Sequence, residues 1–336
     1  MLDLLEKLIN ISSLTGEEGE LGCYLENLLR EQGYRVERQQ VGRDRFNLLA
    51  RLAAEPVVLL STHLDTVAPH FPARRRADRL WGRGACDAKG SIVAMLEAGR
   101  ELLARDTESF ALLFVVGEEA FSDGAKTAAQ MQLNSRYVII GEPTENKLAA
   151  GQKGSLVFRL EARGVAGHSA YPEIGDSALH RLIRLLERWL DADWGRDDLL
   201  GESTLNIGVI QGGDGANVIA AGAEAEGIFR VAGSIGDIRR RIDNLLENGI
   251  DFQVRSASEP QHLAVLPGFE QTVVSFGSDA AHLRPLGEIL LCGPGSVRYA
   301  HGSDEQISAA ELDAAVKLYV SLVQNLLQQE EEQLHD

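Results

Sequence analysis

Three runs of hydrophobic residues along the chain each lead into acidic residues or a histidine. They cover residues 57–61, 111–116 and 137–140 and are rich in Val, Ile and Leu, as expected for strands buried on both faces of a parallel sheet. In open parallel sheets, binding sites form beyond the carboxyl ends of the strands. We therefore expect the side chains that follow the three runs to converge on one crevice: His63 and Asp65, Glu118 and Glu119, and Glu142.

Glu118 and Glu119 stand side by side just after the second run. If the chain stays extended there, neighbouring side chains point in opposite directions. One carboxylate then binds a metal ion while the other faces the substrate as a general base; two solvated acids in a loop are the alternative. His63 and Asp65 share a face if their strand continues, so that Asp65 can hold the ring nitrogen of His63 that does not bind metal.

A glycine-rich segment, residues 80–90, lies between the first two runs and precedes a helical pattern over residues 91–105. Its glycines permit close approach of the backbone, and Asp87 stands near the positive end of the expected helix. A carboxylate in this place either serves chemistry or caps the helix by accepting backbone N–H groups. From this segment alone, the cap is the better interpretation.

The order of the predicted elements indicates two domains. Residues 1–151 alternate helical and strand patterns, which is typical of an α/β layer with a mostly parallel sheet flanked by helices. Residues 152–256 follow the order βαββαβ of the ferredoxin-like unit, and residues 257–336 return to the first domain with a long helical pattern over 308–328. The small domain is thus an insertion. Its predicted strands cover 156–163, 204–210, 224–231 and 251–256, and its predicted helices cover 177–190 and 235–247.

Five short motifs, taken in order, carry a family resemblance. They are Ser-Thr-His-Leu-Asp-Thr at 61–66, Gly-Arg-Gly-Ala-Cys-Asp-Ala-Lys-Gly at 82–90, Gly-Glu-Glu-Ala at 117–120, Gly-Glu-Pro-Thr at 141–144 and Gly-Pro-Gly-Ser-Val-Arg-Tyr-Ala-His at 293–301. Together they resemble the two-metal amidohydrolase family of acetylornithine deacetylase, succinyl-diaminopimelate desuccinylase, aminoacylase and glutamate carboxypeptidase. The last motif and residues 274–280 look most like acetylornithine deacetylase.

The resemblance implies a catalytic domain with two zinc ions and assigns their ligands. Asp87 would bridge the ions, His63 and Glu142 would complete the shell of one, and Glu119 and His301 that of the other. Zinc accepts imidazole and carboxylate ligands, and so do cobalt and manganese. The number of ions is therefore better defined than the identity of the metal.

The same resemblance assigns roles around the metal ions. Glu118 would be the base that activates the bridging water, and Asp65 the partner of His63. In a homodimer formed by the small domain, His168 would reach the neighbouring subunit's site and stabilise the oxyanion; a plain loop histidine is the alternative. Arg230 would bind the substrate carboxylate, although the acid that often precedes this arginine is absent and a surface position on a strand is the alternative. Substrate contacts are also implied for Asn217, Gly277 and Ser278.

Composition narrows the range of partners. The 336 residues include 50 acids against 33 Lys and Arg, and the net charge of −17 argues against binding to nucleic acid or to an anionic membrane. Three cysteines at scattered positions predict a reducing compartment without a disulfide framework. The first residues lack the apolar core of a signal peptide, and no segment has the length and apolarity of a membrane span. We therefore expect a cytoplasmic location.

These observations predict a hydrolase that cleaves the amide bond of an N-acyl amino acid, similar to acetylornithine deacetylase. Two alternatives stay open. A dipeptidase or carboxypeptidase would use the same metal centre on a short peptide. A non-catalytic relative would bind a small carboxylate ligand or a protein, and it would be favoured if the base or a metal ligand were missing from the sequence.

Overall fold

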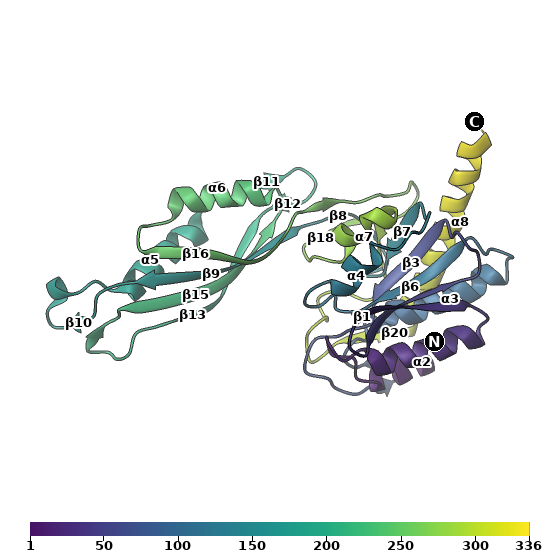
Figure 1. Cartoon of the computed structure of the whole chain (residues 1–336), viewed down its shortest axis with the longest axis horizontal. Coiled ribbons are helices and arrows are strands. Elements are labelled where there is room, and N and C mark those ends of the chain that lie inside the picture. Colours follow the sequence, from purple (N-terminus) through teal and green to yellow (C-terminus); the bar gives the residue numbers. More distant parts are fainter. Residues whose placement is uncertain (336) are drawn as a thin grey trace. The chain divides into compact units, whose positions relative to one another are not determined.

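A computed structural model describes residues 1–335 of the chain. The backbone divides into two compact units. The first comprises Met1–Ala150, Leu263–Thr272 and Ser278–Asp336, and the second comprises Gly151–His262 and Val273–Gly277. The helices and strands of both units are labelled in Figure 1.

The first unit is built on a six-stranded sheet. Strands β3, β6, β7 and β19 run parallel, whereas β1 and β2 extend the sheet antiparallel beyond β6. Strands β3, β6 and β7 are buried along their whole lengths, which explains their unbroken apolar sequences. The order across the sheet is β1 (Arg35–Gly42), β2 (Arg45–Arg51), β6 (Phe110–Val115), β3 (Val58–His63), β7 (Tyr137–Ile140) and β19 (Glu288–Leu291).

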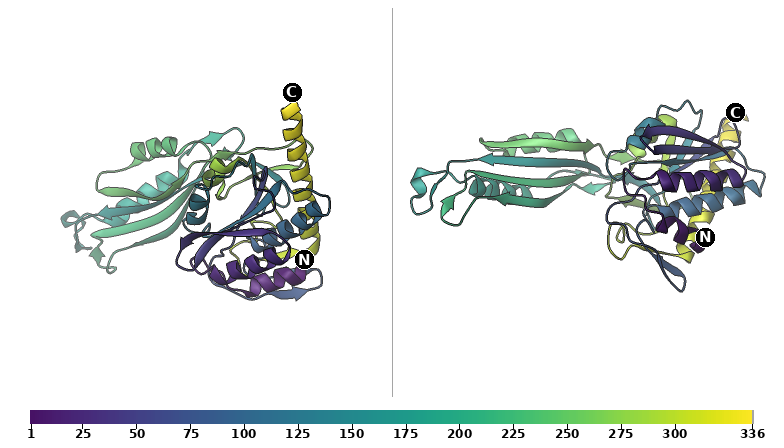
Figure 2. Two further views of the ribbon diagram at one scale, coloured as in Figure 1. Left: turned by 45° about the vertical axis from the view of Figure 1, so that its right-hand side comes forward. Right: turned by 60° about the horizontal axis from the view of Figure 1, so that its bottom comes forward.

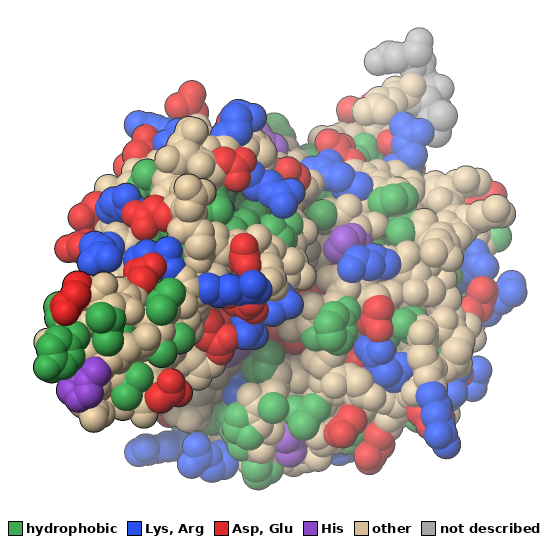
Figure 3. Space-filling model, turned by 60° about the vertical axis from the view of Figure 1, so that its left-hand side comes forward, with side chains coloured by type: hydrophobic (Ala, Val, Ile, Leu, Met, Phe, Trp, Pro, Cys, Tyr) green, Lys and Arg blue, Asp and Glu red, His purple; other side chains and the backbone are tan. Residues whose placement is uncertain are grey.

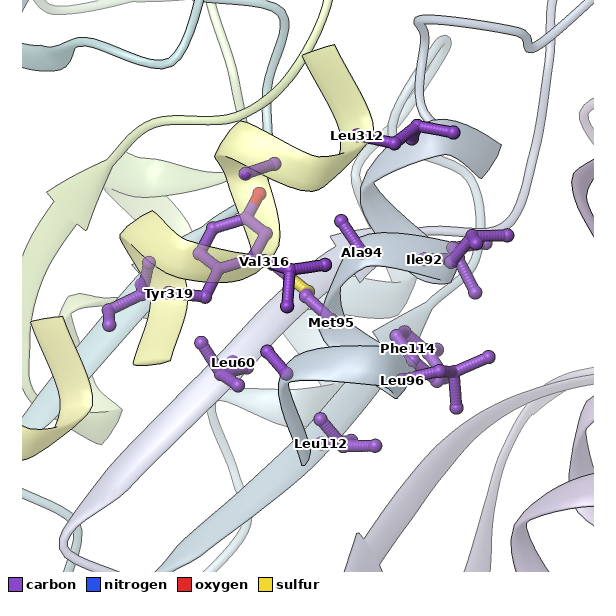
Figure 4. Close-up of a cluster of buried hydrophobic side chains, with 14 of the residues drawn as sticks. Leu60, Ile92, Ala94, Met95, Leu96, Leu112, Phe114, Leu312, Val316 and Tyr319 are labelled. Carbon is purple, nitrogen blue, oxygen red and sulfur yellow. The ribbon is translucent and has the colours of Figure 1, made fainter. Parts of the chain in front are cut away.

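Helices pack on both faces of this sheet (Figure 2). On one face, α3 and α8 lie side by side, and Figure 4 shows Met95 of α3 and Val316 and Tyr319 of α8 above Leu60 and Leu112 of the strands. The short helices α4 and α7 lie against the opposite face. The helices are α1 (Leu2–Asn10), α2 (Gly19–Glu31), α3 (Lys89–Leu103), α4 (Asp123–Ala128), α7 (Ala280–Leu283), the 3-10 helix η2 (Arg284–Leu286) and α8 (Ala309–His335).

A small sheet joins two segments that are far apart in the sequence. Its strands are β20 (Gln306–Ser308), β5 (Arg79–Trp81) and β4 (Arg74–Arg76), in that spatial order. Gln306 pairs with Trp81, so the chain just before β20 lies next to the glycine-rich segment just after β5. Two further strands, β8 (Leu148–Gln152) and β18 (Gln271–Val274), carry the chain across the boundaries between the units.

The second unit confirms the predicted βαββαβ order. Its sheet has the antiparallel order β13-β15-β9-β16, and alternate residues of β9 are buried against α5 and α6. The ring of Phe158 lies 5.5 Å from that of Trp189 and 5.3 Å from that of Phe229, so aromatic side chains fill this core. The main elements are β9 (Gly154–Arg163), α5 (Ala178–Asp191), β13 (Thr204–Gly212), β15 (Gly222–Val231), α6 (Ile235–Leu245) and β16 (Ile250–Ser258).

Shorter elements of the second unit connect these strands and helices. They are β10 (Gly167–His168), the 3-10 helix η1 (Pro172–Ile174), β11 (Arg196–Asp197), β12 (Gly201–Glu202), β14 (Val218–Ile219) and β17 (Gln261–His262).

On the face of the molecule shown in Figure 3, acidic and basic side chains are interspersed. Among the described residues, none of the helices combines the length and the apolar character needed to cross a bilayer.

Candidate metal centre

The carboxyl ends of three neighbouring strands supply most of the candidate site. Strand β3 lies between β6 and β7, and all three run parallel. His63 is the last residue of β3 and pairs with Val115, the last residue of β6, after which a turn carries Glu118 and Glu119. Glu142 follows the end of β7. Because parallel strands end at the same edge of a sheet, these residues are gathered there.

His63, Asp87 and Glu119 form a tight group of metal-ligating side chains. One ligand atom of each lies within 4.8 Å of those of the other two. The Nε2 atom of His63 is 3.0 Å from Oδ1 of Asp87, and both residues are buried. Protein ligands lie about 2.0–2.2 Å from a zinc ion, so two ligands of one ion are at most about 4.4 Å apart. The group is therefore close to the dimensions of a metal site.

His301 reaches the same group from the segment between β19 and β20. Its Nε2 atom is 2.9 Å from Oε2 of Glu119 and 3.4 Å from Oδ2 of Asp87. The two carboxylate oxygens of Asp87 therefore face different histidines: Oδ1 faces His63 and Oδ2 faces His301. A carboxylate that shares its two oxygens between two ions needs this arrangement.

Asp65 fixes the turn that carries the two glutamates. Its carboxylate accepts hydrogen bonds from the backbone N–H groups of Glu118, at 3.0 Å, and Glu119, at 3.1 Å, and from the hydroxyl of Thr15, at 2.9 Å. The Nδ1 atom of His63 is 2.9 Å from the backbone oxygen of Asp65 and 3.5 Å from its carboxylate. The nearer partner of the His63 ring is thus the backbone carbonyl rather than the carboxylate that we expected.

Two local expectations from the sequence are wrong. Glu118 and Glu119 lie in a turn, not in extended chain, because Asp65 binds both of their amides. Asp87 does not cap the following helix: α3 begins at Lys89, its N-cap residue is Ala88, and the Asp87 carboxylate faces the two histidines instead. The cap was the better interpretation of an isolated segment, and tertiary contacts override it.

Negative charge is concentrated in this cluster. Burial, and then the charge of Glu142, raises the pKa of Glu118 well above its usual range. Burial also raises the pKa of Glu142, with Asp87 adding to the effect, and it raises the pKa of Asp279 to about 7. Carboxyl groups shift in this direction when solvent is excluded and like charges are close. A divalent cation would offset this charge, and imidazole with carboxylate is a donor set that zinc accepts, so the residues present fit a metal.

The two histidines respond to the same negative charge. Hydrogen bonds to Asp87 and Glu119 raise the pKa of His301 to about 10. Burial lowers the pKa of His63, but hydrogen bonds to Asp65 and Asp87 outweigh burial and leave that pKa well above its usual range. The carboxylates that draw a proton to these rings would equally draw a metal ion, because protons and metal ions compete for the same nitrogens.

The remaining predicted residues, apart from Ser278, belong to the second unit. Within that unit, β10 and β14 pair His168 with Val218, so His168 and Asn217 lie on neighbouring segments, and the backbone oxygen of Asn217 accepts a hydrogen bond from Ser169. His168 is exposed, and its Nδ1 accepts a hydrogen bond from the backbone of Ala170 at 3.1 Å. Ser278, in the first unit, accepts a hydrogen bond from the backbone of Ala280, and an added Cβ at Gly277 would meet open space.

Arg230 lies at the end of β15, opposite Thr204 and Ser155 in the neighbouring strands. Its side chain is partly buried, and this burial lowers its pKa. Among the residues that the structure describes, no carboxylate pairs with it. A partly buried guanidinium without an acid partner is unfavourable by itself, so the position is suited to an anionic ligand.

Sequence reasoning missed three residues that the structure places at this cluster. Asp279 is buried and its charge acts on Glu118 and Glu142, while Arg83 and Glu305 form a buried ion pair beside Asp87. Arg83 stands inside the glycine-rich motif and Glu305 follows His301 closely, so proximity to motif residues was the available signal. Glu305 binds the backbone amides of Cys86 and Asp87, which lie 219 and 218 residues away from it in the sequence. Contacts between residues so far apart leave no signature in a single sequence.

Comparison with known proteins relates this chain to peptidases. A model of the family described as Peptidase family M20/M25/M40 matches residues 59–325. The chain is 38% identical to a peptidase M20 domain-containing protein of Schizosaccharomyces pombe, over 96% of this chain and 84% of that protein. It is 36% identical to a probable carboxypeptidase of Aspergillus clavatus, over 98% of this chain and 83% of that protein.

A solved structure extends the comparison to the fold. The crystal structure of a tripeptidase from Staphylococcus aureus is similar with a TM-score of 0.83, covering 97% of this chain and 98% of that chain. The two sequences are 18% identical, so this similarity concerns the fold alone. It confirms the predicted mixed α/β architecture.

Proposed function

This chain belongs to peptidase family M20/M25/M40, whose members are metal-dependent hydrolases, and we propose that it cleaves the amide bond beside a free carboxylate in a short peptide. The observation that carries the proposal is the position of Asp87, with one carboxylate oxygen toward His63 and the other toward His301. The name of the Aspergillus clavatus relative, a probable carboxypeptidase, supports the choice of substrate.

We assign the metal ligands as the sequence predicted them. His63 and Glu142 would hold one ion, Glu119 and His301 the other, and Asp87 would contact both. When bound, two divalent ions lower the pKa of a shared water and polarise the scissile carbonyl. Zinc is the metal that we propose, and cobalt or manganese would fit the same ligand types.

Glu118 is the proposed general base. It stands next to the ligand Glu119, and both side chains are partly exposed in a cluster that raises the pKa of Glu118. A carboxylate in that position can take a proton from the attacking water and deliver it to the leaving amine. Asp65 supports this role, because its carboxylate accepts hydrogen bonds from the backbone amides of Glu118 and Glu119 and so fixes the turn.

Most of the proposed contacts to substrate belong to the second unit. Arg230 would bind the carboxylate, since a guanidinium without an acid partner offers a fork of donors to it. His168 would donate a hydrogen bond to the oxyanion in the neighbouring subunit of a homodimer, and its exposure on β10 is compatible with that role. Asn217, Gly277 and Ser278 are the remaining proposed contacts. The homodimer and a cytoplasmic location stay predictions.

A second candidate function keeps the same metal centre. Residues 274–280 and the motif at 293–301 look like acetylornithine deacetylase, which favours an N-acyl amino acid as substrate. Such a substrate also presents a free carboxylate to Arg230. A non-catalytic role is disfavoured, because the base and all five predicted ligands are present.

A matched substrate panel tests the proposal. Free-amine release by the zinc- or cobalt-loaded protein is measured on dipeptides and tripeptides with free or amidated carboxyl ends, and on N-acetyl amino acids led by acetylornithine. The proposed function predicts that free peptides turn over fastest and that amidation abolishes most turnover. Faster release from acetyl substrates would select the second candidate, and equal rates on amidated peptides would exclude recognition of the carboxylate.

A further inference from the structure

Arg83 and Glu305 form an ion pair that is almost completely shielded from water. The Nη1 atom of Arg83 is 2.7 Å from Oε2 of Glu305, and the two side chains are 2% and 1% exposed. Removing two charges from water costs more than their attraction returns unless other hydrogen bonds satisfy both groups. The remaining partners of the pair therefore indicate what it does in the fold.

Glu305 holds the backbone at the bridging aspartate. Its second oxygen, Oε1, accepts hydrogen bonds from the N–H groups of Cys86, at 3.3 Å, and Asp87, at 3.2 Å. The carboxylate thus binds two consecutive amides of the segment that ends at α3. With these amides fixed, the Asp87 side chain starts from a defined backbone position.

Arg83 holds the backbone at the histidine on the other side of the cluster. Its guanidinium donates to the backbone oxygen of His301 at 3.3 Å and to that of Gly302 at 3.5 Å. It also donates to the oxygen of Pro69 at 3.3 Å and lies over the ring of Phe71. One buried pair therefore contacts the main chain at both Asp87 and His301.

The backbone of His301 needs such support. His301 has φ of 63°, in the left-handed region that is costly for an L-residue. In that conformation Nε2 of His301 reaches both Glu119 and Asp87. The hydrogen bond from Arg83 to the backbone oxygen of His301 offsets part of this cost. The position of the His301 ring depends on this backbone conformation.

We propose that Arg83 and Glu305 are positioning residues that hold Asp87 and His301 in their ligand geometry before any metal ion binds. The inference rests on the metal site of the proposed function, but it does not depend on which substrate is cleaved. A positioning role differs from a purely structural role in one consequence. Loss of the pair should reduce the free energy of metal binding by more than it reduces the free energy of unfolding. Partners that orient metal ligands typically contribute 10–100-fold to metal affinity.

Hydrogen exchange on the metal-free wild-type protein is the first test. The amides of Cys86 and Asp87 should exchange slowly without metal, because Glu305 already binds them. Rapid exchange that slows only after zinc is added would overturn the proposal, since the metal would then be organising the segment. This measurement needs no variant, so it decides the matter even if changes to the pair prevent folding.

The second test compares two buried glutamates of the first unit. Glu305→Gln replaces one acceptor oxygen by a donor, and Glu26→Gln does the same to a residue of α2 that is 4% exposed and pairs with Arg30 and Arg38. We expect zinc affinity, measured by calorimetry on metal-free protein, to fall 10–100-fold in Glu305→Gln and to stay within about twofold in Glu26→Gln. Arg83→Met should match Glu305→Gln, and the double variant should add little to either.

The outcomes separate this inference from the proposed function. Unchanged zinc affinity in Glu305→Gln, or an equal loss in Glu26→Gln, would overturn the positioning role even if the enzyme cleaves peptides as proposed. Tight zinc binding that depends on Glu305, in a protein that cleaves none of the panel, would sustain the positioning role and sink the proposed function.

Discussion

The two units of the chain bury different kinds of residue. The second unit has a hydrophobic core in which Phe158, Trp189, Trp194 and Phe229 pack ring against ring. Among its described residues, Lys153 is the one charged residue that is buried, and it lies near the beginning of the unit. The first unit also has a large apolar core, but it buries many charged side chains as well. These are Glu18, Glu26, His63, Asp65, Arg83, Asp87, Lys89, Glu142, Asp279 and Glu305.

Burying a charged side chain is costly, and apolar residues in the same place usually stabilise a fold at least as well. Most of the buried charges of the first unit gather around the ends of β3, β6 and β7, where the proposed chemistry takes place. The comparison therefore predicts a division of effects. Changes to the charges gathered at these strand ends should alter metal binding or catalysis, whereas changes to the aromatic core of the second unit should alter stability.

The largest expected effect is that of Glu118→Gln on turnover. The amide keeps the size of the side chain but cannot take a proton, so kcat should fall by about 10²–10⁴ while zinc binding is retained. Removing a carboxyl whose pKa the cluster raises should leave the melting temperature of the metal-free protein unchanged or higher. Steady-state kinetics and calorimetry check both parts; full activity would show that another group is the base.

A change in the aromatic core should lower stability and leave zinc affinity unchanged. Phe158 is fully buried, and Phe158→Ala should destabilise the second unit by about 3–5 kcal/mol through the cavity that it leaves. Chemical denaturation followed by the fluorescence of Trp189 and Trp194, which lie in this core, measures the loss. Zinc affinity should stay at the wild-type value, and a tenfold change in it would break the division between the units.

Arg230→Met is expected to have an intermediate effect that falls on substrate alone. Hydrogen bonds to a charged group contribute about 1.5–3 kcal/mol, so kcat/KM for a peptide with a free carboxylate should fall roughly 10–100-fold. Arg163→Met, at an exposed position on β9 in the same unit, is the matched control. If both variants lose activity equally, or if Arg230→Met leaves KM and kcat unchanged, Arg230 does not bind the carboxylate.

The smallest expected effect is that of a helix cap. Ser177 precedes α5, and its side chain accepts a hydrogen bond from the backbone of His180 at 3.2 Å. Ser177→Ala should lower the stability of the second unit by about 1 kcal/mol without changing zinc affinity. The denaturation midpoint measures this loss, and an unchanged midpoint would mean that water replaces the cap.

The sequence predicts the frame of the molecule better than the details of the site. Strands β3, β6 and β7 were found because burial on both faces leaves an unbroken apolar run. The order of the second unit was found because its strands and helices keep distinct periods. The predicted long helix at 308–328 continues to His335 in the structure, where polar and acidic residues follow the apolar pattern.

The details that were missed depend on contacts across the whole chain. Asp87 looks like a helix cap until His63 and His301 are brought to it, and Glu118 looks extended until Asp65 binds its amide. Glu305 carries no local sign of its partners, because Asp87 is 218 residues away. Short motifs therefore named the candidate residues of the site, and tertiary structure determines how each of them is held.

The most direct test of the account is the number of zinc ions that the metal-free protein binds, measured by calorimetric titration of the wild type and of Asp87→Asn. The central claim is that Asp87 joins two metal ions at the ends of β3 and β6. It predicts two ions for each wild-type chain and a large loss of affinity for both in Asp87→Asn. A single ion in the wild type, or two ions bound with unchanged affinity in Asp87→Asn, would contradict it.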